Sequence, residues 1–278
     1  MDKKTFRPQR RIEKRYAAAI NTILKGLYRR LAGARSPFQM LEVIRGFARS
    51  PTMNKAAREA AQAMVTNLLK DGARGWRNAA RRGSKGKMIH QALKGEIKGN
   101  EAFYAIISQN SKLIQTVPET MAERLSAKMA KGQIAGKRPE ELMKDIQREF
   151  PHLSAVQARR IARTETSKAS TAITRVRSES AGLTWYVWCT SDDSRVRDSH
   201  AKMDGVIVSW KDPPSPEELV REPSYGHYHA GEIFNCRCYA APLVSTDDVT
   251  WPHKVYYMGR IQSMTLAQFK RITGGGAT

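Results

Sequence analysis

The sequence predicts an α+β protein, with a mainly helical N-terminal region followed by a small α+β module that contains a short sheet. Two observations lead to this prediction. Up to Gly182 the apolar residues recur mostly at intervals of three and four, the period of a helix face. After Gly182, short runs of aromatic and β-branched residues alternate with acidic, proline-bearing loops, which is typical of strands joined by turns. The 278 residues have room for one large or two small domains.

Prolines and glycines predict where the helices begin and end. Proline suits the first position of a helix because its φ is already helical and its missing N–H has no intrahelical partner there. Helices are therefore expected to begin at Pro37, Pro51, Pro118 and Pro139. Helix ends are expected at Gly72, Gly132 and Pro151, with a loop over 83–86. Ser154 is expected to cap a long helix that Gly182 terminates.

Strands are expected over 183–189, 206–210 and 239–244, where aromatic and β-branched residues gather. The final stretch offers a short helix at Leu266–Ile272. We therefore expect three parts: a basic, helical, DNA-facing region over 1–130, an α+β module over 131–245, and a C-terminal tail with a short helix over 246–278.

The charge is strongly positive and concentrated near the N-terminus. The chain has 48 Lys and Arg against 26 Asp and Glu, a net +22, and residues 1–100 carry +18 of it. This asymmetry predicts non-specific binding of double-stranded DNA; the alternative is a solvated, solubilising face. The expected DNA-binding residues are Arg10, Arg11, Lys14, Arg15, Arg29, Arg30, Arg81 and Arg82. Trp76 either stacks on a base or belongs to the core.

The apolar runs, the N-terminal segment and the number of cysteines bear on membrane association, secretion and cellular compartment. No apolar run is long enough to cross a membrane, and Met1 to Arg15 is basic with no apolar segment behind it, so neither a membrane partner nor a secretory signal is expected. Three cysteines do not make a disulfide scaffold and suit a reducing, cytoplasmic compartment.

The cysteines and one histidine form a candidate metal set. Cys236 and Cys238 lie two residues apart and would share one face of an extended strand. With His200 and Cys189 they would make a Cys3His zinc site, although His227 and His229 compete as the nitrogen ligand. The alternative is reduced, buried cysteines and a hydrogen-bonded histidine without metal. In either case the residues of the set are expected to be neighbours in space.

Charged residues around His200 have two interpretations. Asp193 or Asp198 could orient His200 for acid–base or nucleolytic work, or the group could be an ion-pair network that fixes a loop. Arg160, Arg163 and Glu165 are expected to tie their helix to the sheet by salt bridges; the alternative is that they bind a substrate. Asp204-Gly205 is expected to form a tight turn. The sequence has no phosphate-binding glycine loop and no nucleophile elbow. We therefore expect no catalytic residue, no enzyme activity and no small-molecule substrate.

Four ordered motifs resemble those of the phage Mu F-like head morphogenesis family. They are Ala162-Arg163-Thr164-Glu165, the Trp188 to His200 segment with Asp193 and Arg197, Asp204-Gly205, and Asn235-Cys236-Arg237-Cys238. The resemblance covers about residues 130–245, whereas Cys189 does not belong to the family pattern. The residues carrying the motifs are Arg163, Glu165, Asp193, Arg197, His200, Asp204, Gly205, Asn235, Cys236 and Cys238.

The resemblance implies a phage minor capsid and head morphogenesis protein, a low-copy virion component in the head interior or portal region. Such a protein is assembled in the host cytoplasm and associates with the portal, other head proteins and packaged DNA. It would act by binding, in head assembly and in DNA packaging or delivery. The rival class is a metal-dependent nuclease or toxin-like enzyme carried on a phage head module, and a third is a cellular nucleic-acid-binding protein.

Overall fold

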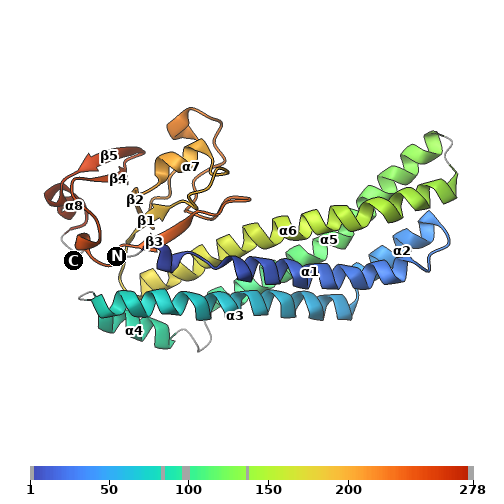
Figure 1. Cartoon of the computed structure of the whole chain (residues 1–278), viewed down its shortest axis with the longest axis horizontal. Helices are drawn as coiled ribbons and strands as arrows, with labels where there is room; N and C mark the ends of the chain where they lie inside the picture. The colour runs from blue at the N-terminus through green and yellow to red at the C-terminus, as the bar shows by residue number, and fades with distance from the viewer. Residues whose placement is uncertain (1–2, 83–84, 96–100, 136–137, 275–278) are drawn as a thin grey trace. The chain divides into compact units, whose positions relative to one another are not determined.

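The computed structural model describes residues 3–82, 85–95, 101–135 and 138–274. It confirms the α+β prediction, and Figure 1 follows the chain through its elements. The helical elements are η1 (Lys3–Phe6), α1 (Arg10–Leu31), α2 (Pro37–Ala48), α3 (Pro51–Arg82), α4 (Gly86–Gly95), α5 (Glu101–Ile134), α6 (Pro139–Ser180), α7 (Asp198–Met203), η2 (Glu218–Val220), η3 (Thr246–Asp248) and α8 (Leu266–Ile272). The strands are β1 (Trp185–Cys189), β2 (Ile207–Ser209), β3 (Tyr239–Pro242), β4 (His253–Tyr257) and β5 (Arg260–Met264).

The chain divides into two compact units. The first, called here the helical unit, comprises Arg10–Thr66 and Ala102–Arg163. The second, the sheet unit, comprises Met1–Gln9, Asn67–Glu101 and Thr164–Thr278. The long helices α3 and α6 contribute residues to both. The sheet unit is therefore assembled from three separate segments of the sequence, one of which is the N-terminus.

The helical unit is held together by the apolar stripe of α1 and by two tyrosine hydroxyls. The buried residues of this helix are Ile12, Tyr16, Ala17, Ile20, Leu24, Leu27 and Leu31. Tyr16 donates a hydrogen bond to Asn110 on α5 at 3.0 Å, and Tyr28 donates one to the carbonyl of Phe150 on α6 at 3.0 Å. Burial of an apolar side chain of this size contributes about 1.5–3 kcal/mol. The spacing of three and four along α1 thus places its apolar side chains in one core.

Pro118 and Pro151 lie inside α5 and α6, so the predicted helix start at Pro118 and end at Pro151 are wrong. A proline in a helix interior costs about 3 kcal/mol, because it removes a hydrogen bond and crowds the preceding turn. Buried residues continue on both sides of each proline, and their packing offsets this cost. These residues are Ile114, Val117, Met121 and Leu125 on α5, and Ile146, Phe150, Ala158 and Ala162 on α6.

Ser154 does not cap a helix, contrary to the prediction. It is buried within α6, and its hydroxyl contacts the Met121 sulfur at 3.3 Å. Gly182 does end α6 as predicted, with a φ of +65°. The backbone N–H of Leu183 bonds to the carbonyl of Ser178 at 2.8 Å, the long hydrogen bond of a Schellman cap. This cap turns the chain from α6 toward β1.

Gly72 lies within α3, so the predicted helix end at this residue is also wrong. A Cβ at Gly72 would lie 2.6 Å from the Nη1 atom of Arg177. Arg177 is buried and donates from Nη2 to the carbonyl of Leu69 at 2.9 Å. Glycine is therefore explained at this position by the close approach of a buried guanidinium. Of the predicted loop over 83–86, residues 83 and 84 lie outside the described residues, and Gly86 begins α4.

In the described part of the chain the strands form one sheet in the order β3-β1-β2-β4-β5. β1 pairs antiparallel with β2 and β3, β2 pairs parallel with β4, and β4 pairs antiparallel with β5. The three predicted strands are confirmed as β1, β2 and β3, and the predicted short helix as α8. The strands β4 and β5 were not predicted from the sequence. Within the described residues, no helix combines the length and the apolar character needed to cross a membrane.

Each face of the sheet covers its own hydrophobic core, because successive side chains of a strand point to opposite faces. On β1, Tyr186 and Trp188 belong to one core, whereas Val187 and Cys189 belong to the other. The first, called the Trp188 core, also contains Met203, Val206, Val208, Trp210, Tyr228, Cys236 and Cys238. The second, called the Trp76 core, also contains Phe6, Ile89, Leu183, Tyr239, Val255 and Phe269.

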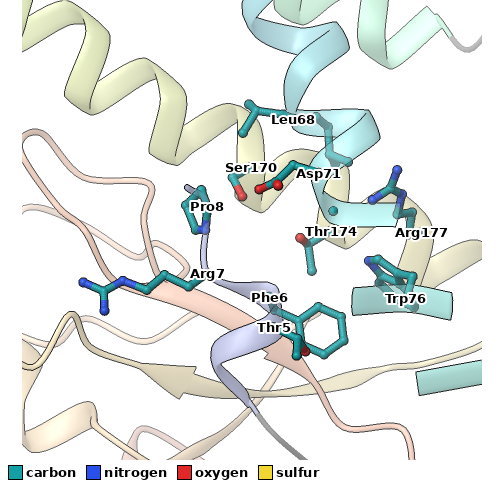
Figure 2. A pocket seen from close by; sticks show the side chains of 12 residues that line it. Thr5, Phe6, Arg7, Pro8, Leu68, Asp71, Trp76, Ser170, Thr174 and Arg177 are labelled. Carbon is teal, nitrogen blue, oxygen red and sulfur yellow. The ribbon is translucent and has the colours of Figure 1, made fainter. Parts of the chain in front are cut away.

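The N-terminal segment η1 is part of the Trp76 core. Phe6 meets Trp76 edge to face with 5.7 Å between ring centroids, and Figure 2 shows the two rings beside Arg177. Trp76 is 1% exposed, so the core interpretation of this residue is confirmed. A Cβ at Gly75 would lie 2.7 Å from the carbonyl oxygen of Thr5. The absence of a side chain at Gly75 therefore lets η1 lie directly against α3.

Candidate metal centre and basic helix face

Three of the predicted ligands meet in the sheet unit. The Nδ1 atom of His200 lies 3.5 Å from the sulfur of Cys236 and 3.4 Å from the sulfur of Cys238. The three donor atoms all lie within 4.8 Å of one another, and all three residues are buried. We call these residues the Cys–His cluster. They come from α7 and from the turn that precedes β3.

The backbone conformation around Cys236 and Cys238 brings both residues close to His200. Asn235 has a φ of +56°, in the left-handed region, and its N–H bonds to the hydroxyl of Thr164 on α6 at 3.0 Å. The N–H of Cys238 then points at the Cys236 sulfur at 3.3 Å. Gly231 brings the same loop close to α6, since a Cβ there would lie 2.8 Å from the hydroxyls of Ser167 and Thr171. The turn thus directs both thiols toward α7.

His200 is oriented by residues that the sequence analysis missed. Its Nε2 atom lies 3.0 Å from the hydroxyl of Tyr228, which donates to the Oε1 atom of Glu217 at 2.6 Å. Both partners come from the loops between β2 and β3. Tyr228 and Glu217 share no sequence motif with His200, so the sequence alone does not identify them as its partners. Asp193 and Asp198, the orienting partners considered from the sequence, do not fill this role.

The two thiols have opposite pKa shifts. The hydrogen bond with Cys238, followed by the nearby His200 ring, holds the pKa of Cys236 well below its usual value. The same hydrogen bond, together with burial, raises the pKa of Cys238. Burial raises the pKa of Tyr228, and the neighbouring Glu217 carboxylate raises it further. The two thiols are thus inequivalent, with the more acidic one at Cys236.

Cys189 does not join the cluster, so the expectation that all four residues are neighbours is wrong for this residue. It belongs to the Trp76 core on the opposite face of the sheet, because it is an odd number of residues from Trp188 along β1. Burial raises its pKa to about 12. The competing histidines also lie elsewhere. His229 is buried against Tyr186, with 3.2 Å from its Nδ1 atom to the hydroxyl, and His227 is exposed and contacts the carbonyl of Pro213.

A pocket of about 100 Å³ opens beside the cluster. It is lined by the three cluster residues together with Ser191, Arg195, Val196, Arg197, Asn235 and Arg237. Arg237 forms a two-pronged ion pair with Asp193, with N···O distances of 2.6 and 2.7 Å. Burial alone would raise the pKa of Asp193, but the Arg195 N–H and the Arg237 charge outweigh it and lower the pKa. The ion-pair interpretation therefore describes Asp193.

The remaining motif residues make local contacts. Arg197 donates to the carbonyl of Phe234 at 3.0 Å and lies over its ring. Asp204 accepts the N–H of Thr190 at 2.8 Å, and Gly205, with a φ of +77°, bonds to the carbonyl of Trp188. The tight turn predicted at Asp204-Gly205 is thus present.

Among the described residues, the ion pairs of Arg163 and Glu165 do not reach the sheet, so the predicted link between α6 and the sheet through these residues is wrong. Glu165 is buried beside Lys168, 3.7 Å away, and burial raises its pKa. Arg163 pairs with Glu13 of α1 at 3.3 Å, within the helical unit, and not with the sheet.

The predicted DNA-binding residues lie mostly on one helix. Arg10, Arg11, Lys14, Arg15, Arg29 and Arg30 are exposed on α1. Arg30 also lies over the ring of Phe47, 5.3 Å from its centroid. Arg81 is exposed on α3 in the sheet unit, and the side chain of Arg82 lies outside the described part of the structure. The eight bases therefore belong to two units.

The exposed side of α1 carries a basic stripe opposite its buried stripe. With 3.6 residues per turn, five exposed bases fall within about 100° of arc and extend over about 27 Å. They are Arg11, Lys14, Arg15, Lys25 and Arg29, and we call them the α1 basic face. The helical unit as a whole contains 23 Lys and Arg against nine Asp and Glu, a net +14, whereas residues 164–278 have 13 of each. The positive charge thus lies mainly outside the region that contains the sheet.

The fold and these residues define a basic α+β protein with a cysteine–histidine cluster on one side of a mixed sheet. Residues 123–241 match the family described as Phage Mu protein F like protein, so this part of the chain is Mu F-like and the resemblance seen in the motifs is confirmed. The match supports a protein of the phage head morphogenesis type.

One relative is similar in sequence, but its description gives no function. An uncharacterized protein of Haemophilus influenzae is 29% identical over 151 residues, which cover 53% of this chain and 31% of the relative. The alignment with this chain thus spans about a third of that protein. No solved structure matches the chain.

Proposed function

We propose that the protein is a phage minor capsid protein, a low-copy virion component that associates with the portal and with packaged DNA. It acts by binding, in head assembly and in DNA packaging or delivery. The observation that carries the proposal is the combination of a Mu F-like segment with a helix whose exposed side carries Arg11, Lys14 and Arg15 near its start and Lys25 and Arg29 near its end. Residence in the head interior or at the portal belongs to the same proposal.

The α1 basic face suits the DNA backbone better than base edges. Arginine and lysine neutralise phosphates without reading sequence, and binding of this kind releases counterions and weakens steeply with salt. The five bases of this face lie on a helix anchored by its opposite side in a core, so their backbone positions are fixed before DNA binds. We therefore assign DNA contact to this face, with the other exposed bases of the helical unit adding long-range attraction.

The sheet unit is proposed to supply contacts with portal and head proteins. The aromatic residues of its strands are mostly buried in the two cores, so they are not available for that purpose. An exposed aromatic pair remains: Tyr225 and Phe234, whose rings meet edge to face at 5.3 Å. Aromatic side chains are enriched where proteins meet, and the near-neutral charge of residues 164–278 favours protein over DNA here.

DNA binding is tested by fluorescence anisotropy of the full-length protein on a random-sequence duplex between about 50 and 200 mM salt. If about six phosphates are engaged, affinity should fall by about 10³ over this range. Changing Lys14, Arg15, Lys25 and Arg29 together to Gln keeps strong helix formers on α1. This variant should reduce the slope of log affinity against log salt by about 3.6, since each phosphate contributes about 0.9.

The control variant changes Lys254, Arg260, Lys270 and Arg271 to Gln, four exposed residues of the sheet unit with the same total charge. It should keep nearly all of the salt slope. Equal losses in the two variants would contradict a specific role for α1, and the absence of binding at low salt would contradict DNA binding altogether. The same samples, incubated with divalent metal, should leave the duplex intact. Metal-dependent cleavage that disappears in His200→Gln would instead favour the nuclease alternative.

A further inference from the structure

We propose that the Cys–His cluster is a mononuclear zinc site with three protein ligands, His200 Nδ1 and the sulfurs of Cys236 and Cys238. The fourth ligand is a water molecule in the adjoining pocket. This proposal stands independently of the proposed function, because it rests only on the geometry of the sheet unit. The first support comes from the distances between the donor atoms.

The donor atoms are spaced as a tetrahedral zinc ion requires. Zinc–sulfur bonds are about 2.3 Å and zinc–nitrogen bonds about 2.0–2.1 Å, so a tetrahedral angle places nitrogen and sulfur about 3.6 Å apart. The observed separations from His200 Nδ1 are 3.5 Å to Cys236 and 3.4 Å to Cys238. Both separations match a single ion bound by nitrogen and sulfur, and all three donor atoms lie within 4.8 Å of one another. Two thiolates and an imidazole are also ligands that zinc favours.

The surroundings of His200 select the nitrogen that binds. The Tyr228 hydroxyl donates its hydrogen to Glu217 at 2.6 Å, so its oxygen accepts from Nε2–H of His200. This contact favours the tautomer with the hydrogen on Nε2, so Nδ1, on the side that faces the sulfurs, is the nitrogen available to bind a metal. A ligating histidine whose other nitrogen is bound in this way is the usual arrangement around zinc.

The backbone also favours metal binding by the two cysteine sulfurs. The backbone N–H of Cys238 points at the Cys236 sulfur at 3.3 Å, which stabilises a thiolate. The left-handed φ of Asn235, +56°, makes the turn that brings both cysteines to one side despite their short spacing. Burial of His200, Cys236 and Cys238 then protects the bonds to the metal from competition with water.

The fourth position faces the pocket and not another protein donor. Among the described residues, the group of His, Cys, Asp and Glu donors near enough to share an ion here consists of His200, Cys236 and Cys238. Cys189 lies in the core of the other sheet face. The pocket of about 100 Å³ touches all three ligands and has room for a metal-bound water. The arginines of its lining, Arg195, Arg197 and Arg237, favour an anion in exchange for that water.

The first experiment measures metal in the full chain purified without chelator. About one equivalent of zinc is expected in the wild type and in Cys189→Ala, the matched control that removes the cysteine of the other core. Cys236→Ser and Cys238→Ser should each lose most of it. Less than a tenth of an equivalent in the wild type, after zinc has been offered during purification, would overturn the proposal.

The second experiment does not depend on cysteine variants that fail to fold. Cobalt exchanged into the wild type should give the thiolate-to-cobalt charge-transfer absorption and the intense visible bands of a tetrahedral site. Tyr228→Phe keeps all three ligands but removes the bond that orients His200, and should weaken zinc binding by about 10- to 100-fold in chelator competition. Unchanged zinc affinity in this variant, or octahedral cobalt bands, would contradict the proposed geometry.

The open fourth position has its own test. Added azide should shift the visible bands of the cobalt protein, since it can replace the water beside the arginines. Bands that do not respond to azide would show that the fourth position is closed and would refute this part of the proposal.

Discussion

Replacing Gly75 by alanine tests whether η1 is held against α3. In an open helix interior the change stabilises by about 1 kcal/mol, because alanine has the higher helix propensity. Here the new Cβ would lie 2.7 Å from the carbonyl oxygen of Thr5 and 3.2 Å from its carbonyl carbon. Since an ordinary contact begins near 3.4 Å, the N-terminal segment must move by about 0.7 Å.

That movement disturbs the packing of Phe6 on Trp76 shown in Figure 2. Overpacking of a well-packed region costs about 1–3 kcal/mol, and an edge-to-face aromatic pair contributes about 0.5–1.5 kcal/mol beyond its buried area. After the gain in helix propensity is subtracted, we expect Gly75→Ala to lower the free energy of unfolding by about 0.5–3.5 kcal/mol.

Urea denaturation separates this effect from a general effect of alanine. The five tryptophans, Trp76, Trp185, Trp188, Trp210 and Trp251, all lie in the sheet unit, so their fluorescence reports its unfolding. The control is Gly46→Ala in α2, where nothing lies within 4 Å of the new Cβ. This control should have a free energy of unfolding about 0.5–1 kcal/mol above that of the wild type. Its unfolding is followed by circular dichroism, since the tryptophans lie in the other unit. If Gly75→Ala also stabilises the protein, η1 does not lie against α3 as described.

Two further predictions concern His229 and the exposed aromatic pair. Burial lowers the pKa of His229 from 6.5 to about 4, so the unfolded chain takes up this proton more readily than the folded protein. The corresponding stability is complete above pH 6.5 and is lost as the pH falls toward 4, by about 2 kcal/mol at pH 5. Between pH 7 and 5, urea denaturation should show a larger loss for the wild type than for His229→Gln, and equal losses would refute the shift. Changing Tyr225 and Phe234 to Ser should lower the amount of protein that co-purifies with phage particles, whereas the exposed aromatics Phe38 and Tyr104, changed to Ser, should not. Normal incorporation of the first variant would rule out the aromatic pair as the contact with head proteins.

The helices could be predicted from the sequence, but not every helix boundary at a proline could. The rule that proline begins or ends a helix follows from local geometry, and it holds at Pro37, Pro51 and Pro139. At Pro118 and Pro151 burial on both sides of the proline outweighs the lost hydrogen bond, and that burial depends on which helices lie alongside. Gly72 is a similar case. The contact that excludes a side chain there comes from Arg177, more than 100 residues away in the sequence.

The candidate site could be predicted only where a short motif in the sequence marks its residues. The spacing of Cys236 and Cys238 and the motif around His200 singled out three residues that do lie together in the structure. Cys189 was assigned wrongly because strand pairing alone does not say which face a side chain takes, and the alternation along β1 sends it to the other core. The strand β4 was missed because it places two polar residues before its apolar ones, and β5 because only Ile261 and Met264 of its five residues are apolar.

The way the sheet unit is built limits how this chain can be recombined. The Mu F-like match ends at residue 241, yet β2 hydrogen-bonds to β4, which lies beyond that residue, and the core beneath β3 is completed by Phe6 from the opposite end of the chain. A chimaera that transplanted residues 123–241 alone would leave β2 with an open edge and the Trp76 core without a cover. Exchange of this region between phages would therefore have to carry the N-terminal turn and the final hairpin along with it.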